Sequence, residues 1–510
     1  MKQGETAELE APRALRSRRV SVARNSIWNF AGQIAPLFLG VFAIPILIHR
    51  LGTDRYGLLT LAWVLVGYFS LFDLGIGRAI TKLLAEKIAL EDSVSAARLI
   101  GTAIFTMLLL GTLFGGILFA LAPWLTTSVL KIPPALRAET LRSLPLLAIA
   151  VPFVTVTCGL RGMLEAQQNF AAVNALRAGL GAATYLGPLV VLPFSHSLFP
   201  VVVTLAAARV IGCGLHYWVC HRYIPVFSQS KGLDRHALRA LLGFGSWYTI
   251  SNLSSPIMVY LDRFVIGSLL SMSAVAYYAT PLDAVTKLWV IPVAFAGVLF
   301  PAFSEALATR NRERTNSLYE RGIGSILAIV FPSVLVIVLF APEGLRLWLG
   351  ANFAVRSAVI MRILAIGVFT NSLANMPYAL LQAAGRPDLT AKIHMVEVPC
   401  YLALLYWGIW ARGLEGAAIA WTVRLSVEAA VLFFMAKDAL APRLWVTMAA
   451  GTATLLVACG ITELVFKILF LIVVLSVFTG VIWRWTLDDL LRLRVRSWLR
   501  VMPVQDKASA

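Results

Sequence analysis

Charged residues are scarce in this chain of 510 residues: Asp, Glu, Lys and Arg together make up 14% of it, whereas hydrophobic residues make up 59%. An ordinary soluble domain carries about 25% charged residues, so a water-exposed globular fold is excluded for most of the sequence. The mean hydropathy of +0.80 indicates an integral membrane protein instead.

Acidic residues are especially few, with 26 Asp and Glu against 44 Lys and Arg, so the net charge is +18. Such a balance is also typical of proteins that bind nucleic acid. Here the basic residues lie between oily segments and form no patch on a soluble domain. We therefore expect no nucleic-acid partner, and we interpret the basic residues as determinants of membrane topology.

The sequence also lacks the usual patterns of catalysis and metal binding. It has no GxSxG, HExxH or Walker loop, so we predict no catalytic residue and no direct use of ATP. Its cysteines follow no CxxC or Cys/His spacing, which predicts neither a disulfide framework nor a metal site. We expect no cofactor, although coupling to a proton or sodium gradient stays open. The cysteines are Cys158, Cys213, Cys220, Cys400 and Cys459.

Long apolar runs fill most of the chain, and each approaches the roughly 20 residues that a membrane-spanning helix needs. They are rich in Leu and Ala and lack the period-two alternation of membrane strands. The sequence therefore predicts an all-α polytopic membrane protein with about 14 transmembrane helices. The runs are 27–48, 57–77, 99–122, 143–162, 171–193, 199–219, 241–261, 276–303, 322–342, 358–381, 391–411, 414–436, 444–462 and 466–484.

Lys and Arg are unevenly distributed among the connections. With the N-terminus inside, and with residues toward the ends of spans counted in the adjoining connection, the inner segments hold 30 of the 44 basic residues, the outer loops hold 10, and 4 lie deeper within spans. Because cytoplasmic loops carry the excess of Lys and Arg, we predict that both termini face the cytoplasm. The outer loops are short, which leaves no room for an inserted soluble domain.

A polar segment at residues 220–240 divides the chain into two halves. We predict a basic cytoplasmic tail, an N-terminal six-helix bundle, a cytoplasmic linker, a C-terminal six-helix bundle, two further transmembrane helices and a second basic tail. Their respective bounds are 1–26, 27–219, 220–240, 241–436, 437–484 and 485–510.

The two halves show weak signs of a repeat. Glu86 and Glu305 each follow the second helix of a half and lie 219 residues apart. The segment LGTDRYG (51–57) also resembles IGSLLSMSAVAYYA (266–279). Both halves begin on the same side of the membrane, so such a repeat is parallel, with its axis along the membrane normal.

Charges within the predicted spans are costly in lipid and often mark a transport pathway. They include two pairs spaced four residues apart, Asp283 with Lys287 and Arg424 with Glu428. The alternatives are a self-neutralised pair on one helix or a side chain that reaches the interface. The candidate cavity residues are Arg209, Asp283, Lys287, Arg362, Glu397, Arg424 and Glu428. Their surplus of cations would suit an anionic passenger.

A second group of residues has the character of gates or helix ends. Asp73 closes an uncharged run of a predicted helix, and prolines remove backbone donors inside predicted spans. Two histidines, His216 and His394, are candidates for titration in a proton-coupled cycle, with a structural role as the alternative. The gate or structural candidates are Asp73, Arg78, Asp262, Arg263, Pro45 and Pro292.

The segment IPILIHRLGTDRYGLLTLAWVLVGYFSLFDLGIGRAITKLLAE (44–86) resembles the opening of Wzx-type polysaccharide flippases of the multidrug/oligosaccharidyl-lipid/polysaccharide exporter superfamily. Two further segments, 260–306 and 371–392, are similar to later helix junctions of that family, and the resemblance covers roughly residues 25–435. The matched positions of the first two segments are Pro45, Leu51-Gly52, Tyr56-Gly57, Asp73-Leu74-Gly75, Arg78, Asp262, Gly267, Tyr277 and Pro301.

The resemblance implies a V-shaped pair of six-helix bundles with two peripheral helices, working by alternating access in the bacterial inner membrane. The passenger would be an oligosaccharide on an undecaprenyl-pyrophosphate carrier, with other polysaccharide-assembly proteins as partners. Within the superfamily, an ion-coupled drug or metabolite exporter and a peptidoglycan-precursor flippase are alternatives. From another class, a membrane polysaccharide polymerase or ligase is the alternative, but such enzymes carry a large outer loop.

Overall fold

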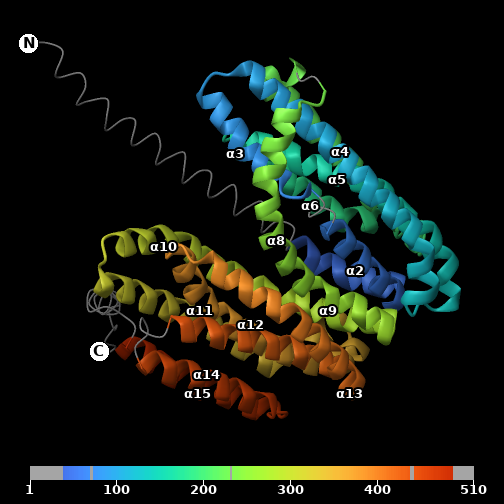
Figure 1. Ribbon diagram of the computed structural model, residues 1–510. Coiled ribbons are helices and arrows are strands. Elements are labelled where there is room, and N and C mark those ends of the chain that lie inside the picture. The colour runs from blue at the N-terminus through green and yellow to red at the C-terminus, as the bar shows by residue number, and fades with distance from the viewer. Residues whose placement is uncertain (1–37, 69–72, 230–231, 437–441, 486–510) are drawn as a thin grey trace, which may run out of the picture. The chain divides into compact units, whose positions relative to one another are not determined.

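The computed structural model describes residues 38–68, 73–229, 232–436 and 442–485. These residues form helices joined by short connections, and no strand occurs among them (Figure 1). The all-α prediction is therefore confirmed. The predicted tail at 1–26, the start of the first predicted helix at 27–37, and residues 486–510 of the second tail lie outside the described residues.

The chain divides into two compact units, Met1–Ala276 and Tyr277–Ala510. Unit 1 contains a helix at Phe38–Leu51, α2 (Thr53–Tyr68), α3 (Ile76–Ala89), α4 (Ser93–Trp124), α5 (Pro134–Ala166), α6 (Phe170–Val191), α7 (Leu198–Tyr223), the short turn η3 (Pro225–Gln229) and α8 (Arg235–Leu269). Helix α9 (Met272–Thr286) passes from the first unit into the second. Unit 2 continues with η4 (Lys287–Trp289), α10 (Val290–Ala308), α11 (Arg312–Leu349), α12 (Ala351–Ala383), α13 (Pro387–Met435), α14 (Pro442–Cys459) and α15 (Leu464–Trp485).

Every predicted span overlaps a helix of the structure. Among the described residues, eight helices are long and apolar enough to cross a membrane, and two shorter apolar helices accompany them. Helix α13 holds two predicted spans, because the chain reverses at Arg412 and at Gly413, whose φ is 56°. The total of fourteen crossings stays a prediction.

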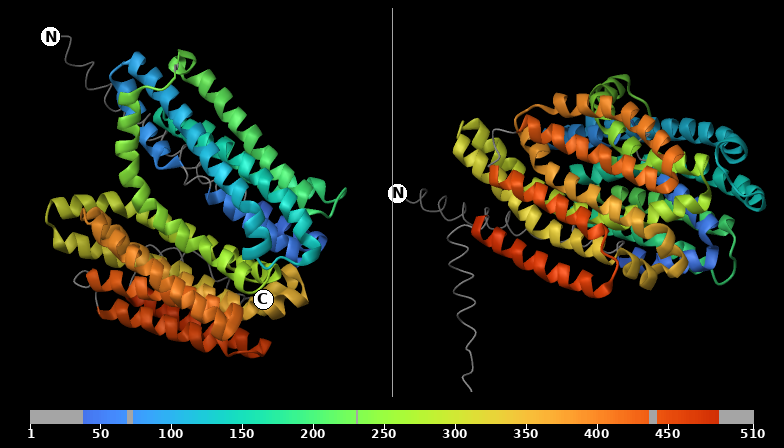
Figure 2. Two further views of the ribbon diagram at one scale, coloured as in Figure 1. Left: turned by 45° about the vertical axis from the view of Figure 1, so that its right-hand side comes forward. Right: turned by 90° about the horizontal axis from the view of Figure 1, so that it is seen from below.

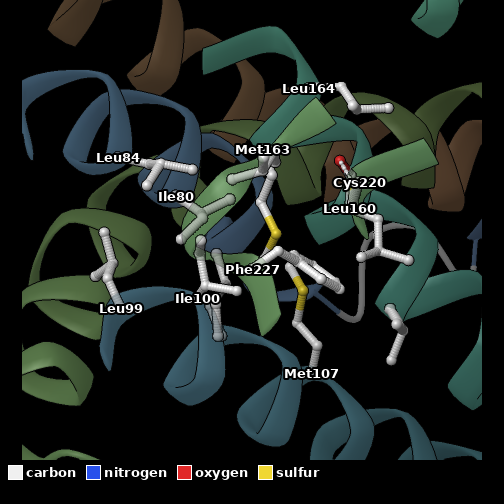
Figure 3. Packing of buried hydrophobic residues seen from close by; sticks show 14 of the residues in the cluster. Ile80, Leu84, Leu99, Ile100, Met107, Leu160, Met163, Leu164, Cys220 and Phe227 are labelled. Carbon is white, nitrogen blue, oxygen red and sulfur yellow. Dashed lines mark hydrogen bonds between the residues drawn. The ribbon is translucent and has the colours of Figure 1, made fainter. Parts of the chain in front are cut away.

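The core of unit 1 includes a cluster of buried hydrophobic side chains from α3, α4, α5, α7 and η3 (Figure 3). Helices α4 and α5 run side by side for most of their length (Figures 1 and 2). Phe227, from the segment 220–240, lies among Met107, Met163 and Leu160 and is 2% exposed. This segment is thus packed into unit 1, and its role as the divider of the halves stays a prediction.

The LGTDRYG segment docks on the start of α9. The carboxylate of Asp54 accepts a hydrogen bond from the backbone N–H of Ser273 at 3.0 Å, and Gly57 leaves room for the carbonyl of Met272, which a Cβ would strike. Beside them, Arg55 pairs with Glu139 of α5 at 3.1 Å. Asp54 and Ser273 are 219 residues apart, which is the offset of the weak sequence repeat.

Polar side chains fix where several helices begin. Each accepts a hydrogen bond from a backbone N–H of the first turn, which would otherwise have no partner. Ser95 holds the pKa of Asp92 below its ordinary value, so this cap is lost only as the pH falls through that lowered pKa. The capping residues are Asp92 for α4, Asn169 for α6, Ser197 for α7, Asp234 for α8 and Asn311 for α11.

The Asp73-Leu74-Gly75 signature is a related helix start, in which Gly75 is the N-cap residue of α3 and the acceptor side chain lies two positions earlier. Leu74 and Gly75 have left-handed backbones with φ of 47° and 73°, a sharp turn that glycine adopts without strain. The Asp73 carboxylate accepts the N–H of Gly75 at 2.9 Å and that of Gly77 at 3.1 Å. The carboxylate at the end of an oily run therefore caps α3.

Contacts of two basic side chains attach α14 and α15 to the rest of unit 2. Arg362 of α12 donates hydrogen bonds to the carbonyls of Val338 in α11 and Cys459 in α14. Lys467 of α15 is 1% exposed and meets Glu343 of α11 at 2.6 Å. The two terminal helices lie along one edge of unit 2 in both views of Figure 2.

We predict that Asp73→Ala lowers the stability of the protein by about 1–2 kcal/mol, since two backbone N–H groups lose their acceptor. Asp73→Asn keeps one acceptor oxygen and should lose less. Denaturant unfolding in mild detergent measures the difference. Lys82→Ala, on the exposed face of the same helix, is the matched control, and an alanine variant as stable as the wild type would contradict the capping role.

Candidate functional site: a buried charge cluster in α13

Helix α13 is a tight hairpin of two antiparallel arms, residues 387–411 and 414–435. Near the reversal the arms touch backbone to backbone, because a Cβ on Gly408 would lie 2.7 Å from the carbonyl oxygen of Gly416. Glycine at both positions permits this approach. The close contact sets the register of the arms and decides which side chains meet further along.

Charged and aromatic side chains from both arms meet inside the hairpin. Nε of Arg424 lies 3.4 Å from Oε1 of Glu397, and its guanidinium stands over the ring of Tyr401 at 5.1 Å. One turn away, Nε2 of His394 lies 3.3 Å from Oε1 of Glu428. We call these five residues the α13 cluster.

The α13 cluster is buried. The side chains of Arg424 and Glu397 are 6% and 10% exposed, and those of Glu428 and His394 are 11% and 17% exposed. Both carboxylate oxygens of Glu397 are buried without a hydrogen-bond partner in the described part of the chain. A carboxylate in such surroundings depends on nearby charge for its stability.

Ligand atoms of His394, Glu397 and Glu428 lie within 4.8 Å of one another. Two carboxylates face one guanidinium, so with a neutral imidazole the α13 cluster carries one surplus negative charge. The arrangement can therefore take up one positive charge, whether from a proton or from a small cation.

The α13 cluster lies about 10 Å from the open end of the hairpin, because His394 is seven residues into the first arm and Glu428 seven residues from the end of the second. Helix α12 covers the hairpin closely. Thr422 donates a hydrogen bond to the carbonyl of Ile363 at 2.9 Å, and Gly367 leaves room for that threonine.

The structure brings together three of the predicted cavity residues, Glu397, Arg424 and Glu428. The sequence suggested a pair on one arm, Arg424 with Glu428, but Arg424 reaches Glu397 on the opposite arm. Of the other predicted pair, Asp283 is half-buried and Lys287 is exposed. The α-helix gives way to the 3-10 turn η4 at Lys287, so the regular four-residue spacing is interrupted there.

Arg209 and Arg362 lie outside the α13 cluster. One guanidinium nitrogen of Arg209, on α7, donates to Thr184 of α6 at 3.1 Å, while its Nε is buried with no hydrogen-bond partner in the described chain. Arg362 is held by the carbonyls of Val338 and Cys459. Of these two arginines, Arg209 keeps donor capacity for a passenger, whereas Arg362 ties helices together.

The gate candidates have varied surroundings. Asp262 and Arg263 are buried, 0% and 3% exposed, although the sequence suggested an interfacial pair. Arg78 is exposed near the start of α3. Pro45 is half-buried within its helix. Pro292 is the third residue of α10, just after η4, and cannot donate to the carbonyl of the preceding turn, which accounts for the local change in helix type.

Three further contacts are not predicted by the sequence. They are the ring of Tyr401 under Arg424, the Lys467–Glu343 pair and the Arg55–Glu139 pair. The signal available for the α13 cluster was its spacing, with ionisable residues three or four positions apart on each of two adjacent helices. The pairing across the arms requires a register that the sequence alone does not give.

Comparisons with known proteins define the class. This chain matches a solved structure of a MATE family multidrug resistance transporter of the MOP superfamily, in its inward-facing conformation, with a TM-score of 0.67 at 16% identity. The match covers 84% of this chain and 99% of that one. The outward-facing structure of such a transporter matches with a TM-score of 0.58 at 17% identity. This match covers 84% of this chain and 96% of that one. The fold is thus that of this superfamily of membrane transporters.

The sequence comparisons give the family. Residues 22–307 match the family described as polysaccharide biosynthesis protein. A Shigella flexneri protein described as "Putative O-antigen transporter" is 30% identical over 418 residues, 81% of this chain and 97% of the relative. EpsK of Bacillus subtilis, an uncharacterized membrane protein, is 20% identical over 416 residues, 79% and 80% of the two chains. The chain belongs to the polysaccharide biosynthesis protein family, and the resemblance found in the sequence is confirmed.

We predict that Arg424→Leu destabilises the protein by about 3–5 kcal/mol, because it leaves buried carboxylates without their cation. The double variant Arg424→Leu/Glu397→Leu removes both charges of the pair and should recover most of that loss. Thermal unfolding in detergent measures both, with Arg412→Ala at the exposed reversal as the control. A double variant as unstable as the single one would contradict the pairing.

Proposed function

We propose that this protein flips a polyprenyl-pyrophosphate-linked oligosaccharide, such as an O-antigen, capsule or exopolysaccharide repeat unit, across a membrane by alternating access. The observation that carries the proposal is the extended similarity to the O-antigen transporter relative, which runs through 97% of its length. The family match at residues 22–307 supports the same class. As a member of a transporter family, the protein is not an enzyme of the pathway.

The chemistry of such a passenger agrees with the charges in the helices. A sugar and a pyrophosphate cannot enter hydrocarbon unaided, because an unpaired ion costs several kcal/mol or more to bury. Arg209 is the strongest contact candidate, since its guanidinium makes a single hydrogen bond to a neutral hydroxyl in the described chain. Arginine binds phosphate oxygens well, through two parallel hydrogen bonds.

The proposal includes a location and an orientation. We place the protein in the cytoplasmic membrane of a bacterium with both termini inside, because the basic residues gather in the segments predicted to be internal. Its partners would be membrane lipids, the lipid-linked glycan and other polysaccharide-assembly proteins. A peptidoglycan-precursor flippase and a drug exporter would share this fold. Measuring which molecule is transported therefore distinguishes these alternatives.

For the passenger contact, we predict that Arg209→Ala lowers export of the polysaccharide about tenfold, the effect of losing one charged hydrogen bond. Arg209→Lys should restore part of it. The measurement is surface polysaccharide in cells whose only flippase is the variant, normalised to the amount of protein in the membrane. Arg222→Ala, at the exposed end of the same helix, is the control, and normal export by Arg209→Ala would exclude this contact.

For the orientation, we predict that Arg412→Cys is labelled from outside the cell and Leu90→Cys only after the membrane is opened. Both positions are exposed and lie at opposite ends of predicted spans. The test uses a variant whose five native cysteines are replaced and a maleimide that does not cross membranes. Labelling of Leu90→Cys in intact cells would reverse the proposed topology.

A further inference from the structure

We propose that the α13 cluster is a proton-binding site that couples transport to a proton gradient, with Glu397, Glu428 and His394 sharing one exchangeable proton beside Arg424. The inference rests on the proposed function and adds an energy source to it. The proton comes from the water on one side and returns to the water on the other. It forms and breaks only an N–H or O–H bond, so no other reactant is needed.

The charge count is the first support. With one proton bound, two carboxylates, one guanidinium and one imidazole sum to zero, and without it they carry one negative charge. A net charge held inside apolar helices is costly, so the neutral state suits the closed hairpin. The state without the proton favours any conformation that admits water or a further cation to the cluster.

Among the described residues, none supplies a second cation to the α13 cluster. Helix α12, which packs on the hairpin, carries two charged residues, and both are engaged elsewhere: Arg362 with backbone carbonyls and Arg356 over the ring of Tyr277. Trp289 of η4 stacks on Trp421 of the second arm. Within the described part of the chain, the charges that act on Glu397 are therefore those of Glu428, Arg424 and His394.

The geometry favours a proton over a metal ion. Arg424 already lies 3.4 Å from Glu397 and supplies the positive charge that a metal would bring, so a divalent ion beside it would be repelled. His394 and Glu428 are 3.3 Å apart, close to the distance at which one hydrogen atom joins two polar atoms. His394 is also the most exposed of the four ionisable side chains, which makes it the entry point for the proton.

The site has a direct spectroscopic test that needs no passenger. Infrared difference spectra of the purified protein in lipid, recorded between about pH 5 and about pH 8, should contain a band from the proton bound in the α13 cluster. Glu428→Gln and Glu397→Gln each remove the surplus charge and should lose that band. Glu305→Gln, an exposed acid paired with Arg314, should keep it. Circular dichroism verifies that each variant is folded.

The coupling is tested in vesicles that contain the protein and a lipid-linked oligosaccharide with a fluorescent sugar. A gradient of one pH unit should bias flipping by the wild type about tenfold, and a protonophore should abolish the bias. Glu428→Gln should flip at the same rate with and without the gradient, while Glu305→Gln responds like the wild type.

The outcomes separate the two proposals. Retention of the infrared band in both cluster variants overturns the proton site, as does calorimetric binding of Zn²⁺ or Na⁺ that His394→Ala abolishes. Flipping by the wild type without a response to the gradient overturns the coupling and leaves the proposed function intact. If the wild type moves no lipid-linked sugar, the proposed function fails, and the infrared result decides the proton site alone.

Discussion

Charge compensation inside apolar helices is the constraint on which this structure depends. Among the described residues of unit 2, three buried or half-buried cations meet defined partners: Arg362 meets backbone carbonyls, Lys467 meets Glu343, and Arg424 meets Glu397. The first two contacts join separate helices at a place where lipid offers no hydrogen bonds. They hold the terminal pair α14 and α15 on the bundle without a large polar interface.

The sequence predicts the helices well because hydropathy is a local property. Runs of about 20 apolar residues are recognisable without knowing their neighbours. Pairing between helices is not local, and the sequence therefore did not identify Glu397 as a partner of Arg424. The intrahelical spacing to Glu428 was visible, whereas the contact with Glu397 depends on the register set by Gly408 and Gly416. The predicted site residues were present, but their grouping required coordinates.

The same limit applies to the two segments that carry the family resemblance. Asp73-Leu74-Gly75 and LGTDRYG were recognisable by resemblance, but their physical roles were not. One segment is a capped helix start with left-handed backbone, and the other caps the start of α9 through Asp54.

The two ends of the α13 hairpin have different properties, and this difference bears on how the α13 cluster could work. At the reversal the arms are fixed by glycine contacts that leave no space to move. The cluster is near the opposite end, about 10 Å from the open termini of the arms, where side chains join them. A change of one unit of charge there acts on the end of the hairpin that lies away from the glycine contacts. Proton binding would thus draw the two arms of α13 together at the open end and leave the packed reversal unchanged. The conformational change would then be confined to one end of the hairpin.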